Sequence, residues 1–367
     1  MFKVKSILVL ISTAVFTLAI VLLVCSPAWA TYPGQNGRIA FVGNFTGTWQ
    51  VYTINPDGTD LFQVTNLPAT ELFPAGWFPN YSPDGQRIAF SHDMTGAVEL
   101  YVINVDGTGL TQITHDNAEN LFPQWSPDGT HILFSAQYIG DPFDYHRLAT
   151  IRPDGSDRRI ITNSLFDDIF PEYTIDARQI VFSSSRGNLI SALWTMNSDG
   201  SHKKRITEPA LEAGAVDVSP DGHHMVFVNQ AGTELPSNLV VSNLDGTHQK
   251  NVTERGQFID PAYSPNGKNI IFSGAAAEGD PFNLYIINSD GSARTLLLAC
   301  PEFMLGSELG LEAIKSEVLV LGAVHLDRVH EDAIGHNLKH FWSMKPKAPN
   351  YAQRMRKGQE REEEPHQ

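Results

Sequence analysis

The sequence predicts an all-β protein, a six-bladed β-propeller of four-stranded blades with a partly helical or disordered C-terminal tail. Two short turn motifs alternate along the chain, each occurs six times, and β-branched and aromatic segments flank both. The markers of the first motif are Asn36, Asp84, Asp128, Asp176, Asp221 and Asn266, and those of the second are Asp57, Asp106, Asp154, Asp199, Asp245 and Asp290. A period of about 45 residues with several short strands per unit is typical of propeller blades.

The first motif, as in "YSPDGQRIAF", has the chemistry of a hairpin turn. Proline presets φ and Asp-Gly supplies the left-handed geometry of the turn. Asparagine fills the aspartate position in two repeats, and it could not keep the charge of a metal ligand or general base. We therefore interpret these pairs as turn residues: Asp84 and Gly85, Asp128 and Gly129, Asp221 and Gly222.

The second repeat illustrates the expected blade. Four strands are predicted, at 77–81, 87–91, 99–104 and 110–114. The two turn motifs then lie on one face of the ring, and the loops between second and third strands lie on the other, with the crossovers between blades. Those loops vary in length and sequence, so binding specificity is expected on this loop face; solvated surface is the alternative.

The innermost strand carries a Pro-x-aromatic signature. It occurs as Pro79-Asn80-Tyr81, Pro123-Gln124-Trp125, Pro171-Glu172-Tyr173 and Pro261-Ala262-Tyr263, and as Val216-Asp217-Val218 in the fifth repeat. These aromatic rings are expected to pack between neighbouring blades rather than to stack on a ligand.

Residues 1–30 are interpreted as a signal peptide. Lys3 and Lys5 precede an apolar run, and "AWA" predicts cleavage after Ala30, which would place the protein in the periplasm or outside the cell. An uncleaved membrane anchor is the alternative. A lipoprotein signal is disfavoured because Val24 precedes Cys25. The expected mature chain keeps one cysteine, which allows no intrachain disulfide.

The repeats span the domain predicted at 31–299, and residues 300–367 form an atypical tail. The first repeat lacks an innermost strand, and "CPEF" copies the Pro-x-aromatic signature, so Ala299–Leu305 is predicted to supply it. Beyond it, one or two helices and a disordered charged end are expected. The repeat motifs stop at this point and the residue pattern changes, which suggests a fused or frame-shifted terminus.

The chain carries a net charge of −15, which disfavours nucleic acid and anionic membrane surfaces as partners. Basic proteins or cations are compatible with this charge. A monomer is expected.

The repeats "WSPDG" and "LYVINVDGTGLTQIT" resemble the TolB-like propeller family, over residues 34–297. The resemblance implies a six-bladed fold, and its periplasmic members bind an outer-membrane lipoprotein and help maintain the cell envelope. Propellers of prolyl-oligopeptidase-type peptidases and of some sugar lyases are similar. The repeats begin a few residues after the signal, without the α/β domain that precedes the family's propeller, so the family's role is not transferred.

Catalytic motifs are weak. No Gly-x-Ser-x-Gly nucleophile turn, phosphate loop or dinucleotide fingerprint occurs, and "HEDAIGH" has the wrong spacing for a zinc protease. Solvated histidines are favoured over zinc at the tail residues His325, His330, His336 and His340. No cofactor is expected, although a channel cation is conceivable at four acids of the crossovers, namely Asp116, Glu119, Asp167 and Asp168.

"GDPF" occurs in two loops of the loop face, in repeats three and six, which face each other across the ring. It is either residual similarity from duplication or a pair of contacts on one binding face, formed by Asp141, Phe143, Asp280 and Phe282.

The favoured function is an exported, non-enzymatic scaffold that binds a protein or peptide partner. A channel-centred lyase or hydrolase acting on carbohydrate or peptide is one alternative, and a truncated or decayed propeller without activity is another.

Overall fold

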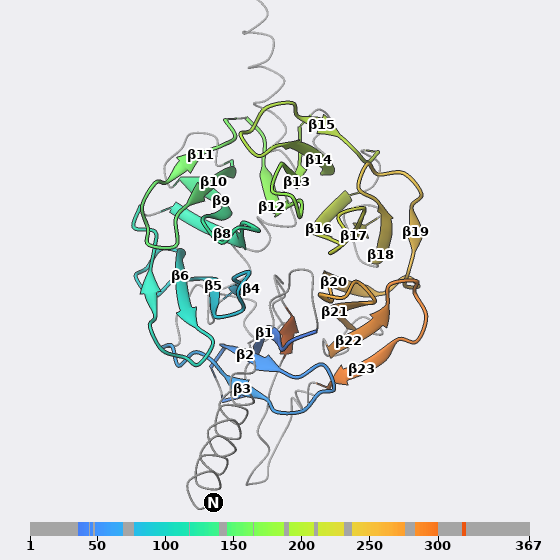
Figure 1. The fold of residues 1–367 in the computed structure, drawn as a ribbon, viewed down its shortest axis with the longest axis horizontal. Helices are drawn as coiled ribbons and strands as arrows, with labels where there is room; N and C mark the ends of the chain where they lie inside the picture. The colour runs from blue at the N-terminus through green and yellow to red at the C-terminus, as the bar shows by residue number, and fades with distance from the viewer. Residues whose placement is uncertain are drawn as a thin grey trace, which may run out of the picture.

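A computed structural model describes residues 36–43, 45–46, 48–68, 77–116, 118–138, 145–163, 165–186, 191–208, 212–230, 237–275 and 283–299, and the backbone of 318–320. The described residues form six four-stranded antiparallel sheets arranged around a central channel (Figure 1), and none of them is helical. The predicted six-bladed all-β fold is confirmed.

Blades 2 to 6 are meanders whose first strand lines the channel and whose last strand lies at the rim. Blade 1 holds β1 (Ile39–Gly43), β2 (Gln50–Ile54) and β3 (Phe62–Gln63); blade 2 holds β4 (Trp77–Tyr81), β5 (Arg87–His92), β6 (Glu99–Asn104) and β7 (Thr111–Gln112); blade 3 holds β8 (Ala118–Trp125), β9 (Ile132–Tyr138), β10 (Arg147–Ile151) and β11 (Arg159–Ile160). Blade 4 holds β12 (Asp168–Tyr173), β13 (Gln179–Ser184), β14 (Ala192–Asn197) and β15 (Lys204–Arg205); blade 5 holds β16 (Glu212–Val218), β17 (His224–Gln230), β18 (Ser237–Asn243) and β19 (Lys250–Asn251); blade 6 holds β20 (Gln257–Tyr263), β21 (Asn269–Ala275), β22 (Asn283–Asn288) and β23 (Thr295–Leu298).

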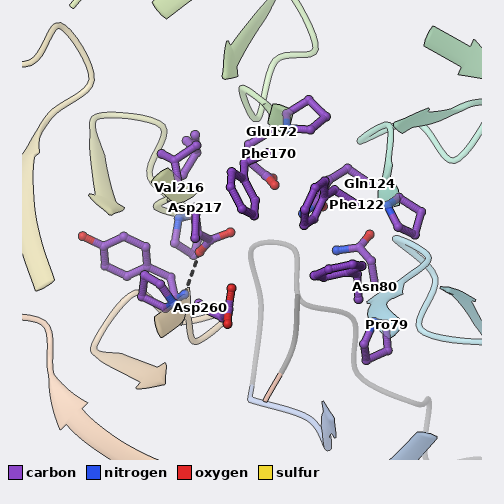
Figure 2. Close-up of a pocket in the computed structure, with 18 of the residues that line it drawn as sticks. Pro79, Asn80, Phe122, Gln124, Phe170, Glu172, Val216, Asp217 and Asp260 are labelled. Carbon is purple, nitrogen blue, oxygen red and sulfur yellow. Dashed lines mark hydrogen bonds between the residues drawn. The ribbon is translucent and has the colours of Figure 1, made fainter. Parts of the chain in front are cut away.

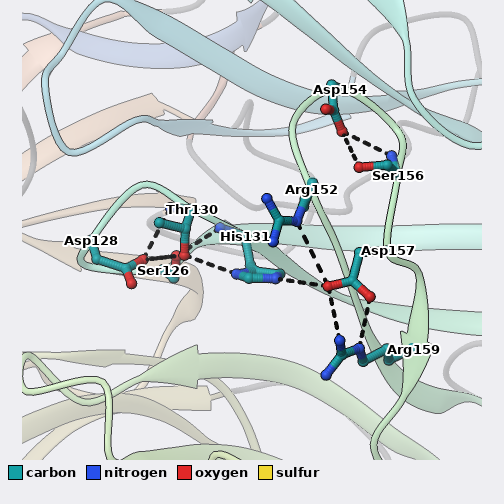
Figure 3. Close-up of polar contacts among 9 residues, drawn as sticks. All are labelled: Ser126, Asp128, Thr130, His131, Arg152, Asp154, Ser156, Asp157 and Arg159. Carbon is teal, nitrogen blue, oxygen red and sulfur yellow. Dashed lines mark hydrogen bonds and ion pairs between the residues drawn. The ribbon is translucent and has the colours of Figure 1, made fainter.

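The first turn of each blade from 2 to 6 is held by its acid or amide. In blade 3 the Asp128 carboxylate accepts hydrogen bonds from the Ser126 hydroxyl at 2.6 Å and from the Thr130 backbone N–H at 3.0 Å. Gly129 follows at φ 69°. Figure 3 shows the second turn on the same face, joined through His131, whose Nε2 lies 3.7 Å from Asp157.

The turns of the other blades repeat this geometry. Gly85 and Gly222 have φ values of 67° and 70°, and a serine hydroxyl donates to the adjacent Asp84 or Asp221 carboxylate at 2.5 Å. In blade 4 a non-glycine, Ala177, takes the turn position at φ 56°.

The aromatic residues of the Pro-x-aromatic signature lie between blades. Trp125 packs with Leu100 and Ile113 of blade 2 and with Phe134 of its own blade. Tyr81, Tyr173 and Tyr263 take equivalent places in three other interfaces. The predicted packing role is confirmed, because burial of these rings joins the cores of adjacent sheets.

A second contact joins the blades near the rim. Gly107, in the second turn of blade 2, has φ +84°, and a Cβ there would lie 2.8 Å from the Val64 carbonyl oxygen of blade 1. Gly58 of blade 1 meets the Leu297 carbonyl of blade 6 in the same way, at 2.9 Å. Only glycine permits this approach, and the second case joins the last blade to the first.

The innermost strand of blade 1 corrects the expectation from the sequence. It is β24 (Val318–Val320), antiparallel to β1, with Phe41 opposite Val320. The assignment of this strand to Ala299–Leu305 is therefore wrong, as is a helix at 318–320; residues 300–305 and the rest of the tail lie outside the described residues. The connection from Asp290 to Pro301 is shorter than its counterparts in other blades, whereas Val-Leu-Val has high β-propensity.

The described residues include no helix long and apolar enough to cross a bilayer.

Two glycine substitutions separate backbone strain from blade packing. Gly107→Ala and Gly96→Ala both place a side chain at similar positive φ, but the alanine Cβ at position 96 meets nothing within 4 Å. Each should lose about 1–2 kcal/mol to left-handed strain. Gly107→Ala should lose about 1–3 kcal/mol more through overpacking. Urea unfolding of both variants measures the difference, and equal losses would remove the packing argument.

Removing β24 should expose the edge of β1 and favour association between chains. We expect a chain that ends at Glu317 to melt lower and to scatter more light on storage than one that ends at His325. Identical behaviour of the two chains would show that β24 does not close blade 1.

Candidate binding site in the channel

The innermost strands of blades 2 to 6 share a β-bulge. The pairing of each with the next strand shifts by a residue at this point. One residue in each bulge has positive φ, namely Phe78 at 55°, Phe122 at 56°, Phe170 at 50°, Ala215 at 37° and Asp260 at 51°. Bulges re-aim side chains, and strained non-glycine residues cluster at functional sites. The bulges therefore make the channel the candidate functional site.

The bulge residues line a channel cavity of about 100 Å³ (Figure 2). Ile175 and Pro220, from the first turns of blades 4 and 5, also line it, so the cavity lies in the half of the channel nearer the turn face. A cavity of this volume holds several waters or one side chain, because a single water needs only roughly 10–15 Å³ of such space.

One wall of the cavity is aromatic. The Phe78 and Phe122 ring centroids are 4.1 Å apart, and those of Phe122 and Phe170 are 4.2 Å apart. The tilted rings form a row across three adjacent blades. Such a row offers apolar contact and the negative faces of π-systems to a ligand.

The other wall carries carboxyl groups. Asp260 is 6% exposed, and its Oδ2 atom is buried without a hydrogen-bond partner among the described residues. Burial raises the pKa of Asp260 well above its usual value. Burial also raises the pKa of Asp217 to about 7, although its Oδ2 accepts a hydrogen bond from the Tyr263 backbone N–H at 2.6 Å.

Glu172 lies between the two walls. The residue is partly exposed, but its Oε2 atom is enclosed and has no partner among the described residues. Burial raises the pKa of Glu172 well above its usual value, and the nearby charge of Asp217 raises it further. The raised pKa values favour the protonated forms of these acids, and a positively charged ligand would favour their ionisation.

The crossover acids predicted from the sequence do not line this cavity. Asp168 forms an ion pair with Arg186 at 2.6 Å, Asp167 lies 3.0 Å from His146, and Asp116 lies 2.6 Å from Arg158. Glu119 is half-buried. Arginine or histidine side chains therefore lie beside three of these acids.

Other predicted positions lie outside the described residues: Asp141, Phe143, Asp280, Phe282 and the tail histidines. A binding role for these residues remains a prediction. In the part of the chain that the structure describes, no three His, Cys, Asp or Glu side chains are grouped to hold a metal ion.

Sequence reasoning missed the residues that line the cavity. The sequence contains a pattern that could have identified them. Three repeats read Phe-Pro-polar-aromatic, as in Phe78-Pro79-Asn80-Tyr81, and the sixth reads Asp260-Pro261-Ala262-Tyr263. The structure also gives the polar residue a role in two blades. The Asn80 Oδ1 accepts a hydrogen bond from the Trp125 backbone N–H at 3.0 Å, and the Asp217 carboxylate accepts the equivalent bond from Tyr263.

Asp260→Asn should stabilise the unliganded protein at pH 8. A carboxyl whose folded pKa is raised favours folding least at high pH, because the unfolded state gives up its proton first. Each unit of raised pKa is worth about 1.4 kcal/mol, so we expect a gain on the order of 1 kcal/mol or more at pH 8 and little change at pH 4.

Thermal unfolding of this variant at the two pH values measures the effect, with the exposed Glu254→Gln as the charge-matched control. A variant that is no more stable than its parent at pH 8 would contradict the burial argument.

Comparison with known proteins places the chain among propellers. The family model for the TolB beta propeller domain matches residues 23–150 and 144–303. TolB from Acinetobacter baumannii has a similar structure at 21% identity, with a TM-score of 0.60, and the match covers 72% of this chain but only 64% of that one.

A putative TolB from Agrobacterium tumefaciens is similar at 18% identity, with a TM-score of 0.58, and the match covers 71% of this chain and 89% of that one. An oligogalacturonate lyase in complex with manganese is similar at 16% identity, with a TM-score of 0.52, and the match covers 73% of this chain and 77% of that one. No curated protein sequence matches this chain. The structural matches indicate the fold, and the family match extends over most of the residues: this chain belongs to the TolB beta-propeller domain family.

Proposed function

We propose that this protein is a non-enzymatic propeller that binds a protein or peptide partner in the cell envelope or outside the cell. The observation that carries the proposal is the channel cavity, where an aromatic row faces acids whose enclosed oxygen atoms have no partner among the described residues. Apolar walls with a few placed polar groups are typical of binding sites.

The lining residues favour binding over nucleophilic catalysis. The described lining residues include no serine, cysteine, histidine or lysine, so this part of the cavity wall supplies no activated nucleophile of these types. The cavity's size fits one inserted group of a partner.

The proposed location depends on the segment 1–30 and on the periplasmic members of the family. Export would bring the propeller to partners of the envelope. The net charge of −15 favours a partner with basic groups over nucleic acid.

A second function is favoured by the Glu172 and Asp217 pair. Glycoside hydrolysis uses two neighbouring carboxyl groups, one protonated as the general acid and one ionised as the base or nucleophile, and the raised pKa of Glu172 suits the acid. Incubation with cell-wall and plant polysaccharides tests this alternative. New reducing ends or unsaturated products that disappear in Glu172→Gln would favour an enzyme over a scaffold.

A variant that fills the cavity tests the proposed binding site. Ala262 lines the cavity and is half-buried, so Ala262→Phe should block insertion without removing a polar contact. We expect the chain from Thr31, immobilised and exposed to envelope extract, to retain one or more discrete partners. Ala262→Phe should retain at least tenfold less of them, measured by quantitative mass spectrometry.

The control is Thr111→Phe, on an exposed outer strand, which should bind like the parent. A Phe143→Ser, Phe282→Ser double variant reports on the loop face. If this variant loses the partner and Ala262→Phe keeps it, the partner binds the loop face and the channel assignment is wrong. Absence of any specific partner would contradict the scaffold function itself.

A further inference from the structure

The two walls of the cavity differ in chemistry, and a ligand must be compatible with both. Figure 2 shows Phe122 and Phe170 on the opposite side of the cavity from Asp260. A bound group therefore meets π-faces on one side and carboxyl oxygens on the other. Neutral apolar groups would satisfy the first wall and leave the second without partners.

Among the described lining residues, no positively charged side chain accompanies the carboxyl wall. Glu172, Asp217, Asp260 and Tyr263 are the ionisable residues that line the cavity, and no lysine or arginine is among the described lining residues. The Oδ2 atom of Asp260 is buried and has no hydrogen-bond partner in the part of the chain that the structure describes. An unsatisfied buried acceptor is unfavourable, so a ligand that donates hydrogen bonds and carries positive charge recovers the most free energy here.

Size and shape narrow the ligand further. The volume of about 100 Å³ admits one side chain rather than a folded segment. A guanidinium is planar, so it can lie against a phenyl ring, and its five N–H donors can reach carboxyls on two blades at once. An ammonium is a more strongly hydrated point charge, which fits a phenyl row less well.

We propose that the channel receives an arginine side chain of the protein partner, with its guanidinium between the Phe122–Phe170 row and the carboxyls of Asp217 and Asp260. The inference rests on the proposed binding function and names the group that is recognised. The phenyl row excludes water from one face of the guanidinium. The carboxyls accept its hydrogen bonds from the other side.

Short probe peptides test the proposal with the full chain. The probes are acetyl-Gly-Arg-Gly-amide, the same peptide with citrulline, the same peptide with lysine, and free spermidine. Citrulline keeps the shape of arginine without its charge. Ligand-observed NMR titration at pH 7.5 and constant ionic strength measures each dissociation constant.

We expect the arginine peptide to bind at least tenfold more tightly than the citrulline peptide and more tightly than the lysine peptide. Asp260→Asn should weaken arginine binding by tenfold or more, while Glu254→Gln should not change it. Phe122→Leu should weaken it several-fold and keeps an apolar residue in the core; circular dichroism checks that both channel variants remain folded.

Equal binding of the arginine and citrulline peptides, or unchanged binding by Asp260→Asn, would overturn the proposal. Spermidine that binds more tightly than the arginine peptide would assign the site to free polyamines and also overturn it. These outcomes differ from failure of the binding function. If the inserted group were not arginine, pull-down with the parent chain would still find a partner that Ala262→Phe does not retain.

Discussion

The close packing of neighbouring blades against each other holds the ring together. A single four-stranded sheet has two faces to cover, and here the adjacent blades cover them. Near the channel, aromatic residues such as Trp125 fill the space between sheets. Near the rim, the glycines of the second turns lie against carbonyl oxygens of the preceding blade, as Gly107 does with Val64. Neighbouring blades are thus held together both near the channel and near the rim.

This arrangement sets the character of the channel. Each inner strand from blade 2 to blade 6 contains a bulge, and the positive-φ residue of the bulge lines the cavity. The same backbone device presents phenyl rings in blades 2 to 4 and a carboxyl in blade 6. The repeat therefore fixes where a side chain is presented, and the residue type in each blade decides the chemistry that a ligand meets.

Buried acids without partners oppose folding, and a protein that keeps them commonly uses them. Asp260 combines positive φ, near-complete burial and an oxygen atom without a partner among the residues that the structure describes. By contrast, the acids of the crossovers lie beside arginine and histidine, as Asp168 does with Arg186. The difference in partners, more than the number of acids, separates a candidate site from structural ion pairs.

Local sequence is enough to specify the blades, because their turns and strands depend on neighbours along the chain: Ser-Pro-Asp-Gly folds into the same turn wherever it occurs. The role of the Pro-x-aromatic rings could also be predicted from their repetition. The position of Asp260 on the cavity wall emerges only in the folded ring, since a one-residue shift at a bulge changes which face a side chain takes. The pairing of β24 with blade 1 likewise emerges only there, because a strand so distant in sequence is chosen by the unpaired edge of β1 rather than by any local pattern.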